Sequence, residues 1–466
     1  MLTLENETRG SARQRWAPVI AVLAAMVVVL LAVASAAGNS KIAVVLPLVL
    51  GAGVLMGLLA LSRFHAFLLF ILVLRSSLDL AKLSSAEGGS RVLDPSSLLS
   101  VLFLLVGFLW LAGRYRSQGE LPGSRLRVAF LIFLATCVLS VVGSGNIASS
   151  ALEAMRIASV VMMFAVVEQV CSTVAQTKRV LAAAFASTVV PLALAGIGLL
   201  TGHARGEVKN GVTRVMGTFN QSNEFGRYLM LMIIMGVAIY PALEGRARRL
   251  LGVVLIGAGL CLVPTYTRSA LVAGVLGLLV VGMVHNKKVV LGVIAVAACA
   301  LLLVPSVAAR FGGGSSTTAA TSQQSLDWRL DYWRQVLPLS RETPVTGVGL
   351  SQVQHLTADG QPPHNDYLRA YVETGVLGLC AYLWLLGTLV ATGRRALRAA
   401  PRGSFDRGVA AGFLGCAVAW IAASAVANMF SNVVTLWYFA AFAAAAAAVL
   451  RRHTGREIRV LEMAGR

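Results

Sequence analysis

Long apolar segments separated by short polar ones run along almost the whole chain. Many of the apolar runs reach the roughly 20 residues that an α-helix needs to cross a bilayer. The runs are continuously apolar rather than alternating in polarity, which favours membrane-spanning helices over the strands of a membrane barrel. Hydropathy predicts about fourteen spans, at residues 17–37, 42–61, 64–82, 96–113, 128–143, 151–170, 180–200, 225–243, 250–267, 269–284, 289–309, 372–392, 408–427 and 433–450. The pattern therefore predicts an all-α polytopic membrane protein, with residues 1–466 as a single integral membrane domain.

Basic residues gather in every second loop of this scheme. They precede the first span, follow spans four, six, eight, ten and twelve, and form the C-terminal tail. Since Lys and Arg are enriched in cytoplasmic loops, we expect a multi-pass protein of the cytoplasmic (inner) membrane with both termini in the cytoplasm. These loops explain the net charge of +20, so no nucleic-acid partner is expected. The segment from Ala17 to Ala37 lacks a convincing cleavage site and is interpreted as a retained first span.

Two longer polar loops then fall on the opposite, outer side of the membrane. The first covers residues 201–224, and the large outer loop covers residues 310–371. The large loop opens with a Gly/Ser/Thr-rich stretch at 312–325, whose composition is typical of a flexible segment. From Leu326 onward it contains Trp, Arg, Tyr and Pro, and we expect short ordered helices there.

Arginines on this outer side run against the positive-inside trend and therefore need an explanation. They include Arg214, Arg227, Arg268, Arg329 and Arg369. An anionic ligand at the membrane surface is the simplest explanation, because the planar guanidinium forms bidentate, charge-assisted hydrogen bonds with phosphate groups.

Each arginine also has a plainer interpretation. Arg268 lies between two apolar runs, so it either binds a phosphate at the membrane face or extends along lipid to the headgroups. Arg214 precedes a Gly- and Asn-rich turn that could help to bind an anion, or it is an ordinary loop arginine. Arg227 begins a span and could be an interfacial anchor. Trp333, in a short amphipathic segment, could anchor that segment on the membrane.

A histidine closes the large outer loop. His364 follows Pro362-Pro363 and stands near a predicted helix N-terminus, where the helix dipole would keep an imidazole neutral and suited to act as a general base. It could equally be an incidental loop histidine, as we interpret His203 and His355. Glu373 lies four residues after Arg369, a spacing that predicts an ion pair between them. Neither the carboxylates nor the six scattered cysteines show a metal-ligand spacing, so no metal site is predicted.

These residues, in this order, resemble the family of O-antigen ligases and O-antigen polymerases. The matching elements are Arg214 with Gly217-Thr218-Phe219 and Asn223, Arg268 with Ser269, Arg329 with Trp333, Pro344 with Gly347-Val348-Gly349, His364-Asn365-Asp366-Tyr367-Leu368, and Glu373-Thr374-Gly375 with Gly378. The resemblance implies a metal-independent glycosyltransferase without a cofactor. Such enzymes act in polysaccharide and lipopolysaccharide biosynthesis of the cell envelope, where they transfer a glycan from a polyprenyl (undecaprenyl) diphosphate donor to a glycan or lipid acceptor at the outer face of the membrane.

The resemblance also implies roles for individual residues. His364 would be the base that activates the acceptor hydroxyl, while Arg214 and Arg268 would bind the donor diphosphate. Further substrate contacts are expected from Arg329, Asn223, Arg227, Arg369 and Asn365, and structural support from Glu373 and Trp333. Ligase and polymerase remain open, and a transporter or flippase of lipid-linked glycans is the alternative from another class of protein.

Overall fold

The structure, a computed structural model, describes residues 51–81, 95–209, 212–285, 290–294 and 328–464, except 52, 54 and 293. The chain divides into two units, Met1–Ile71 and Leu72–Arg466. In the first unit, residues 55–62 are helical and α3 (Phe64–Arg75) begins. The candidate site lies wholly in the second unit, which the following paragraphs describe.

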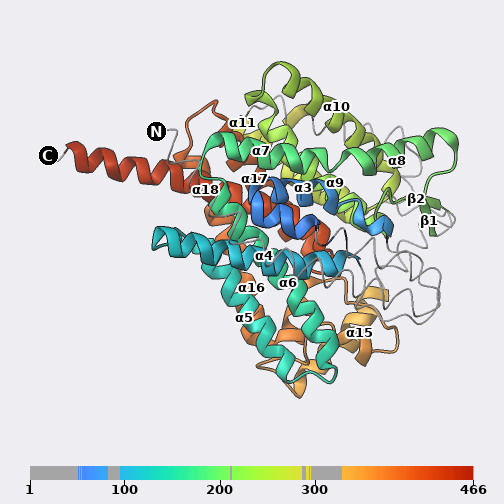
Figure 1. The fold of residues 1–466 in the computed structure, drawn as a ribbon. Coiled ribbons are helices and arrows are strands. Elements are labelled where there is room, and N and C mark those ends of the chain that lie inside the picture. Colours follow the sequence, from blue (N-terminus) through green and yellow to red (C-terminus); the bar gives the residue numbers. More distant parts are fainter. Residues whose placement is uncertain are drawn as a thin grey trace. The chain divides into compact units, whose positions relative to one another are not determined.

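Apolar helices make up most of the second unit (Figure 1). In chain order they are α4 (Pro95–Gln118), α5 (Arg125–Val142), α6 (Ile147–Val170), α7 (Val174–Ala186), α8 (Val189–Thr201), α9 (Ser222–Ile239), α10 (Gly245–Leu262), α11 (Arg268–His285), α16 (Asp366–Ala399), α17 (Phe405–Ser424) and α18 (Val433–Ala464). Among the described residues, ten helical segments are long and apolar enough to cross a membrane, with α7 and α8 together forming one of them. The all-α polytopic prediction is thus confirmed in kind.

The predicted number of fourteen spans stays a prediction. Span 17–37 and most of spans 42–61 and 289–309 lie outside the described residues. Span 64–82, whose outer end is interrupted by Arg75 and Asp79, is helical only in its first part: α3 ends at Arg75 and a 3₁₀ turn follows at Leu78–Ala81. At this break the buried Ser76 hydroxyl donates a hydrogen bond to Ser187 O at 2.7 Å. Both buried polar groups thereby have a partner.

Helix ends coincide with polar capping residues. Ser124, Thr173 and Ser404 each accept a backbone N–H at the start of α5, α7 and α17, and Thr173 forms a full capping box with Gln176. Such caps satisfy donors that a helix start leaves without an intrahelical acceptor. The apolar runs therefore begin where the sequence supplies a cap.

The most buried helices are α9, α17 and α18, including an alanine-rich stretch at 440–448. Small residues let the helices approach closely: a Cβ added to Gly277 of α11 would meet Gly415 O of α17 at 2.8 Å. Close contact of this kind replaces the hydrophobic driving force that lipid cannot provide. These closely packed helices fix the positions of the loops at their ends.

One element is not helical. The first outer loop contains an antiparallel hairpin of β1 (Gly206–Lys209) and β2 (Val212–Val215). Its register places Glu207 opposite Arg214. The all-α prediction missed this hairpin, because two four-residue strands give too short an alternation to stand out from a polar loop.

Hydrogen bonds between loops sort them into two groups, one at each end of the helices. At one end Ser150 contacts Leu350, Arg214 contacts Thr265, and Arg227 contacts Asn428; at the other end Gln169 and Arg451 contact Pro122, and Arg452 contacts Cys171. This grouping agrees with the predicted alternation of loops. Which end faces the cytoplasm, and the outer placement of loops 201–224 and 310–371, remain predictions.

Candidate active site

His364 lies in the turn directly before α16. Its φ is +52°, in the left-handed region that side chains other than glycine rarely adopt. The next residue, Asn365, caps α16: its side-chain oxygen accepts hydrogen bonds from the backbone N–H groups of Tyr367 and Leu368 at 3.0 and 3.1 Å. The imidazole therefore stands in front of a capped helix N-terminus, as the two preceding prolines predicted.

Aromatic residues of the helix at 328–336 hold the turn in place. Trp333 Nε1 donates to Pro363 O at 2.6 Å, and the Tyr332 hydroxyl donates to Gln361 O. The Trp328 ring meets the His364 ring nearly edge-on, with the ring centroids 6.1 Å apart. Trp333 is half-buried and bonded to protein, so its support of the histidine turn has a direct structural basis.

The loop between α17 and α18, residues 425–432, is the element that the sequence analysis missed. The buried Asp366 carboxylate accepts from the N–H of Met429 through both oxygens at 3.0 Å, which fastens this loop to the start of α16. The Asn428 side-chain amide lies 3.0 Å from His364 Nδ1. The sequence did contain a sign of this loop's role. Asn428 and Asn432 bound the short break between predicted spans thirteen and fourteen, which the predicted scheme places on the outer side.

Two of the predicted arginines reach the same 425–432 loop. Arg227 Nη1 donates to Asn428 O at 2.9 Å, and Arg329 Nη1 donates to Val426 O at 3.2 Å. Arg227 comes from α9 and Arg329 from the helix at 328–336, so the loop joins three segments that are far apart in the chain. His364, Arg227 and Arg329 thereby converge on three consecutive residues, 426 to 428.

The arginines near this loop form a cluster of like charge. Burial, together with the positive charges of Arg268 and Arg227, holds the pKa of Arg329 below its usual value. Within the described part of the chain, neither Arg227 nor Arg329 forms a salt bridge with a carboxylate. A cluster of partly buried cations is a favourable place for an anion.

Arg214 is placed differently from the other predicted ligands. It is buried, donating through Nε to Thr265 O at 2.9 Å and through Nη2 to Asn223 Oδ1 at 2.7 Å. Glu207 of the hairpin lies 3.2 Å from its Nη1. Arg214 and Asn223 thus tie the hairpin to the start of α9 and to the turn just before Arg268. Their guanidinium and amide groups are engaged by protein on several sides.

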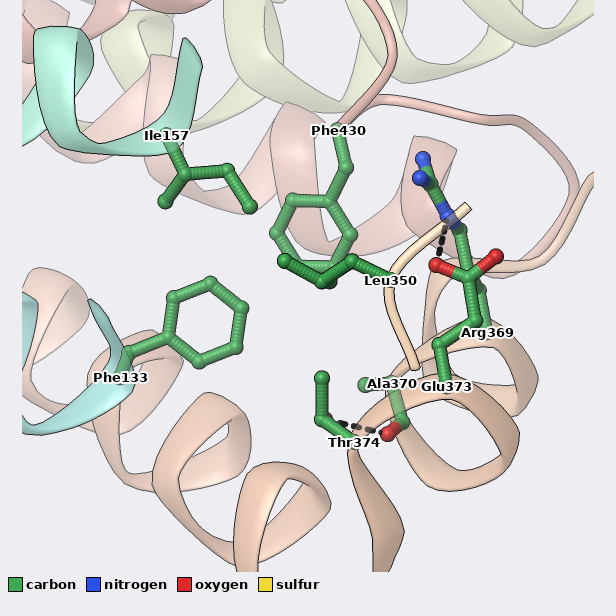
Figure 2. A pocket seen from close by; sticks show the side chains of 8 residues that line it. All are labelled: Phe133, Ile157, Leu350, Arg369, Ala370, Glu373, Thr374 and Phe430. Atoms are coloured by element: carbon green, nitrogen blue, oxygen red, sulfur yellow. Dashed lines mark hydrogen bonds and ion pairs between the residues drawn. The ribbon is translucent and has the colours of Figure 1, made fainter. Parts of the chain in front are cut away.

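Arg369 and Glu373 form the ion pair that their spacing predicted, at 2.8 Å (Figure 2). Arg369 also pairs with Glu153 of α6 at 3.1 Å and donates to Ser431 Oγ of the 425–432 loop at 2.8 Å. The guanidinium is buried between two carboxylates. A small, mostly apolar cavity beside the pair is lined by Phe133, Ile157, Leu350, Arg369, Ala370, Glu373, Thr374 and Phe430.

The glycines of the matching elements sit where the chain makes very close contacts. Gly375 has φ +70° and breaks α16 after Thr374, and a Cβ there would collide with Val345 O. The turn from Pro344 to Gly349 packs against this break, with Gly349 N–H donating to Glu373 O at 3.0 Å. Only glycine tolerates both the positive φ and the approach of a second backbone. The large loop is thereby fastened to the helix that follows His364.

Residues 251–383 match the model of the O-antigen ligase family. The matched stretch begins in α10 and ends in α16, and it includes Arg268, Arg329, His364 and Glu373. Arg214, Arg227 and the 425–432 loop lie outside it. No curated protein matches the chain. The family match supports the resemblance drawn from the residues, and it favours a membrane glycosyltransferase of the O-antigen ligase type in general.

Proposed function

We propose that this member of the O-antigen ligase family transfers a glycan from a polyprenyl diphosphate to a hydroxyl of a glycan or lipid acceptor at the outer face of the cytoplasmic membrane. The observation that carries the proposal is the convergence of His364, Arg227 and Arg329 on the 425–432 loop, close to the charge of Arg268. This convergence supports the proposal, because the reaction requires a base and cations close to one another.

In the proposed reaction the acceptor oxygen bonds to the anomeric carbon of the glycan, and the bond from that carbon to the diphosphate oxygen breaks. His364 takes the hydroxyl proton, for which the imidazole must be neutral. Its place before the N-terminus of α16 favours the neutral form, because the positive end of the helix dipole disfavours an added charge. The polyprenyl diphosphate leaves with the bonding electron pair.

Arginines would stabilise the negative charge that grows on the leaving diphosphate. Arg268 and Arg329 are the strongest candidates, since Arg329 makes a single hydrogen bond within the described residues and feels the charge of Arg268. Arg227 would add positive charge next to the 425–432 loop, to which its guanidinium is hydrogen-bonded through Asn428 O. Arg214 would contribute only when Glu207 moves away from its guanidinium. Arg369, paired with Glu373 and Glu153, would support the fold of the site.

The test is transfer in vitro by the purified protein in lipid nanodiscs, with a defined polyprenyl-diphosphate glycan as donor. We expect a glycosidic product and released polyprenyl diphosphate, unchanged by EDTA. A ladder of products from the donor alone would indicate a polymerase, and transfer to a distinct acceptor would indicate a ligase. Movement of the donor across the bilayer without a new bond would instead identify a transporter and overturn the proposal.

His364→Ala is the decisive variant. Loss of the base should lower kcat by about 100-fold or more. His355→Ala is the matched control, because His355 lies in the same loop and, among the residues that the structure describes, its ring bonds only to the Ser149 hydroxyl, at 3.4 Å. Correctly inserted His364→Ala protein with the full transfer rate would exclude this histidine as the base.

A further inference from the structure

The buried side chain of Asn428 meets the half-buried His364. The amide nitrogen and His364 Nδ1 are 3.0 Å apart, and Asn428 is 5% exposed. The amide oxygen is buried and has no hydrogen-bond partner among the described residues. A buried polar atom without a partner is costly, so a second use of this amide is expected.

The backbone of Asn428 is clamped on both sides. Its carbonyl accepts from Arg227 Nη1 at 2.9 Å, and the following N–H, of Met429, donates to the Asp366 carboxylate at 3.0 Å. Asp366 lies two residues after His364, so the histidine and the amide that faces it are held by one connected set of hydrogen bonds. The amide is therefore fixed in place relative to the imidazole.

We propose that Asn428 is a positioning residue for His364, setting the orientation of the imidazole ring and accepting a hydrogen bond from Nδ1–H while Nε2 acts as the base. The inference rests on the proposed role of His364. A primary amide suits this task because it offers a donor and an acceptor at nearly the same position. With Nδ1 unprotonated, the amide nitrogen donates to it. With Nδ1 protonated, the amide group is turned by 180°, and its oxygen, which otherwise lacks a partner among the described residues, accepts a hydrogen bond from Nδ1–H.

A base that uses Nε2 needs the proton on Nδ1 throughout the reaction. When Nε2 takes the proton of the acceptor hydroxyl, both ring nitrogens become donors, and the amide oxygen stabilises the imidazolium through Nδ1–H. A hydrogen bond to the second nitrogen of a histidine commonly fixes which nitrogen carries the proton. Asn428 would therefore act on the rate of the chemical step rather than on the binding of the donor.

The charged groups around this pair come from three elements. Asp366 of α16 faces the 425–432 loop, Arg227 of α9 contacts the Asn428 carbonyl, and Arg329 of the helix at 328–336 contacts Val426. Arg227 contacts the backbone of Asn428, and Asp366 contacts the backbone of Met429 and Phe430, so these contacts do not involve the Asn428 side chain. A change confined to the side chain of Asn428 leaves these contacts in place, so its effect on His364 can be measured separately.

The experiment compares the variants Asn428→Ala, Asn428→Asp and Asn432→Ala with the unchanged protein, all in nanodiscs. For each protein, kcat and KM of the transfer reaction are measured separately and as a function of pH. Asn428→Ala should lower kcat at least tenfold with little change in KM for the donor. Asn428→Asp keeps the shape and an acceptor for Nδ1–H, so it should retain much of the rate. The carboxylate favours the protonated ring, so the acidic limb of the profile should move to higher pH by about one unit.

Asn432→Ala is the matched control. Asn432 is buried in the same loop, but its oxygen accepts from Thr435 N–H at 2.9 Å, at the start of α18. This variant should lose some thermal stability and keep kcat and the pH profile. If Asn428→Ala does not fold, Asn428→Asp decides: a wild-type rate with an unmoved acidic limb overturns the positioning role. A His364→Ala protein with the full transfer rate would instead exclude His364 as the base, and movement of the donor without a new bond would overturn the proposed function, so these failures are distinguishable.

Discussion

The two ends of the helices in the second unit use arginine in opposite ways. At the end near Pro122, half-buried arginines meet carboxylates: Arg127 pairs with the fully buried Glu168, and Arg452 with Asp406 at 2.7 Å. At the end near His364, Arg227 and Arg329 donate to backbone carbonyls and form no salt bridge within the described residues. A compensated arginine stabilises the fold, whereas Arg329, which lies close to the positive charges of Arg268 and Arg227, is better suited to bind an anion. Arg227 also feels the negative charges of Glu224 and Asp366.

The comparison also divides the arginines at the candidate site itself. Arg369 lies between two carboxylates, and Arg214 faces Glu207 across the hairpin. Both were grouped with Arg268 and Arg329 as substrate contacts on sequence grounds. The structure therefore separates these arginines by their surroundings: Arg214 and Arg369 pair with carboxylates, whereas Arg329 lies close to the positive charges of Arg268 and Arg227.

The largest expected effect comes from removing Arg268 and Arg329, two positive charges that lie close to each other. The double variant Arg268→Ala with Arg329→Ala should lower kcat/KM for the donor by about 1000-fold, since each lost donor to a developing oxyanion costs on the order of 100-fold or more. The control is the double variant Arg334→Ala with Arg341→Ala, which removes the same charge from exposed positions of the same loop. Equal losses in both proteins would mean that net charge, not the cluster, governs donor use.

At the opposite end, Glu168→Gln should damage stability and spare activity. The change leaves the Arg127 guanidinium, bonded to this carboxylate at 2.8 Å through Nε, without its counter-charge, at a cost of about 3 kcal/mol. Thermal unfolding in detergent measures the loss, and transfer per folded molecule should stay at the wild-type level. A change in KM for the donor would show that the two ends are coupled.

The smallest effect is expected for Arg214, which lies at the His364 end but pairs with a carboxylate. Glu207→Gln removes the charge that lies 3.2 Å from Arg214 Nη1, in a carboxylate that is partly exposed. If Arg214 is a diphosphate ligand, the freed guanidinium should lower KM for the donor several-fold, an effect of about 1 kcal/mol. Steady-state kinetics at varied donor concentration provide the measurement. An unchanged KM with slightly lower stability would leave Arg214 a structural residue that fastens the hairpin.

Much of the architecture was accessible from local pattern. The apolar runs predicted where the described membrane-spanning helices lie, because such a helix satisfies all its backbone groups internally and needs a continuous apolar stretch. Two helices extend well beyond their predicted spans: α16 (Asp366–Ala399) against 372–392, and α18 (Val433–Ala464) against 433–450. The predicted span 180–200 is the exception in shape, since α7 ends at Ala186 and α8 begins at Val189. The pairing of Arg369 with Glu373 was equally accessible, since residues four apart on a helix are neighbours wherever the helix packs.

Contacts between distant segments were beyond the reach of such patterns. Asn428 meets His364 across 64 residues, and Glu153 meets Arg369 across 216. The short hairpin that brings Glu207 to Arg214 gave no clear alternation, and the break of α16 at Gly375 depends on the turn from Pro344 that packs into it. Local spacing dictates which residues share a helix face, but not which loops meet at its end. The amino-acid order alone thus defined the membrane helices, the alternating charged loops and the candidate base. The packing of α9, α16, α17 and α18 decided the partners of that base and of each arginine, because those partners come from different helices whose ends only the folded protein brings within hydrogen-bond distance.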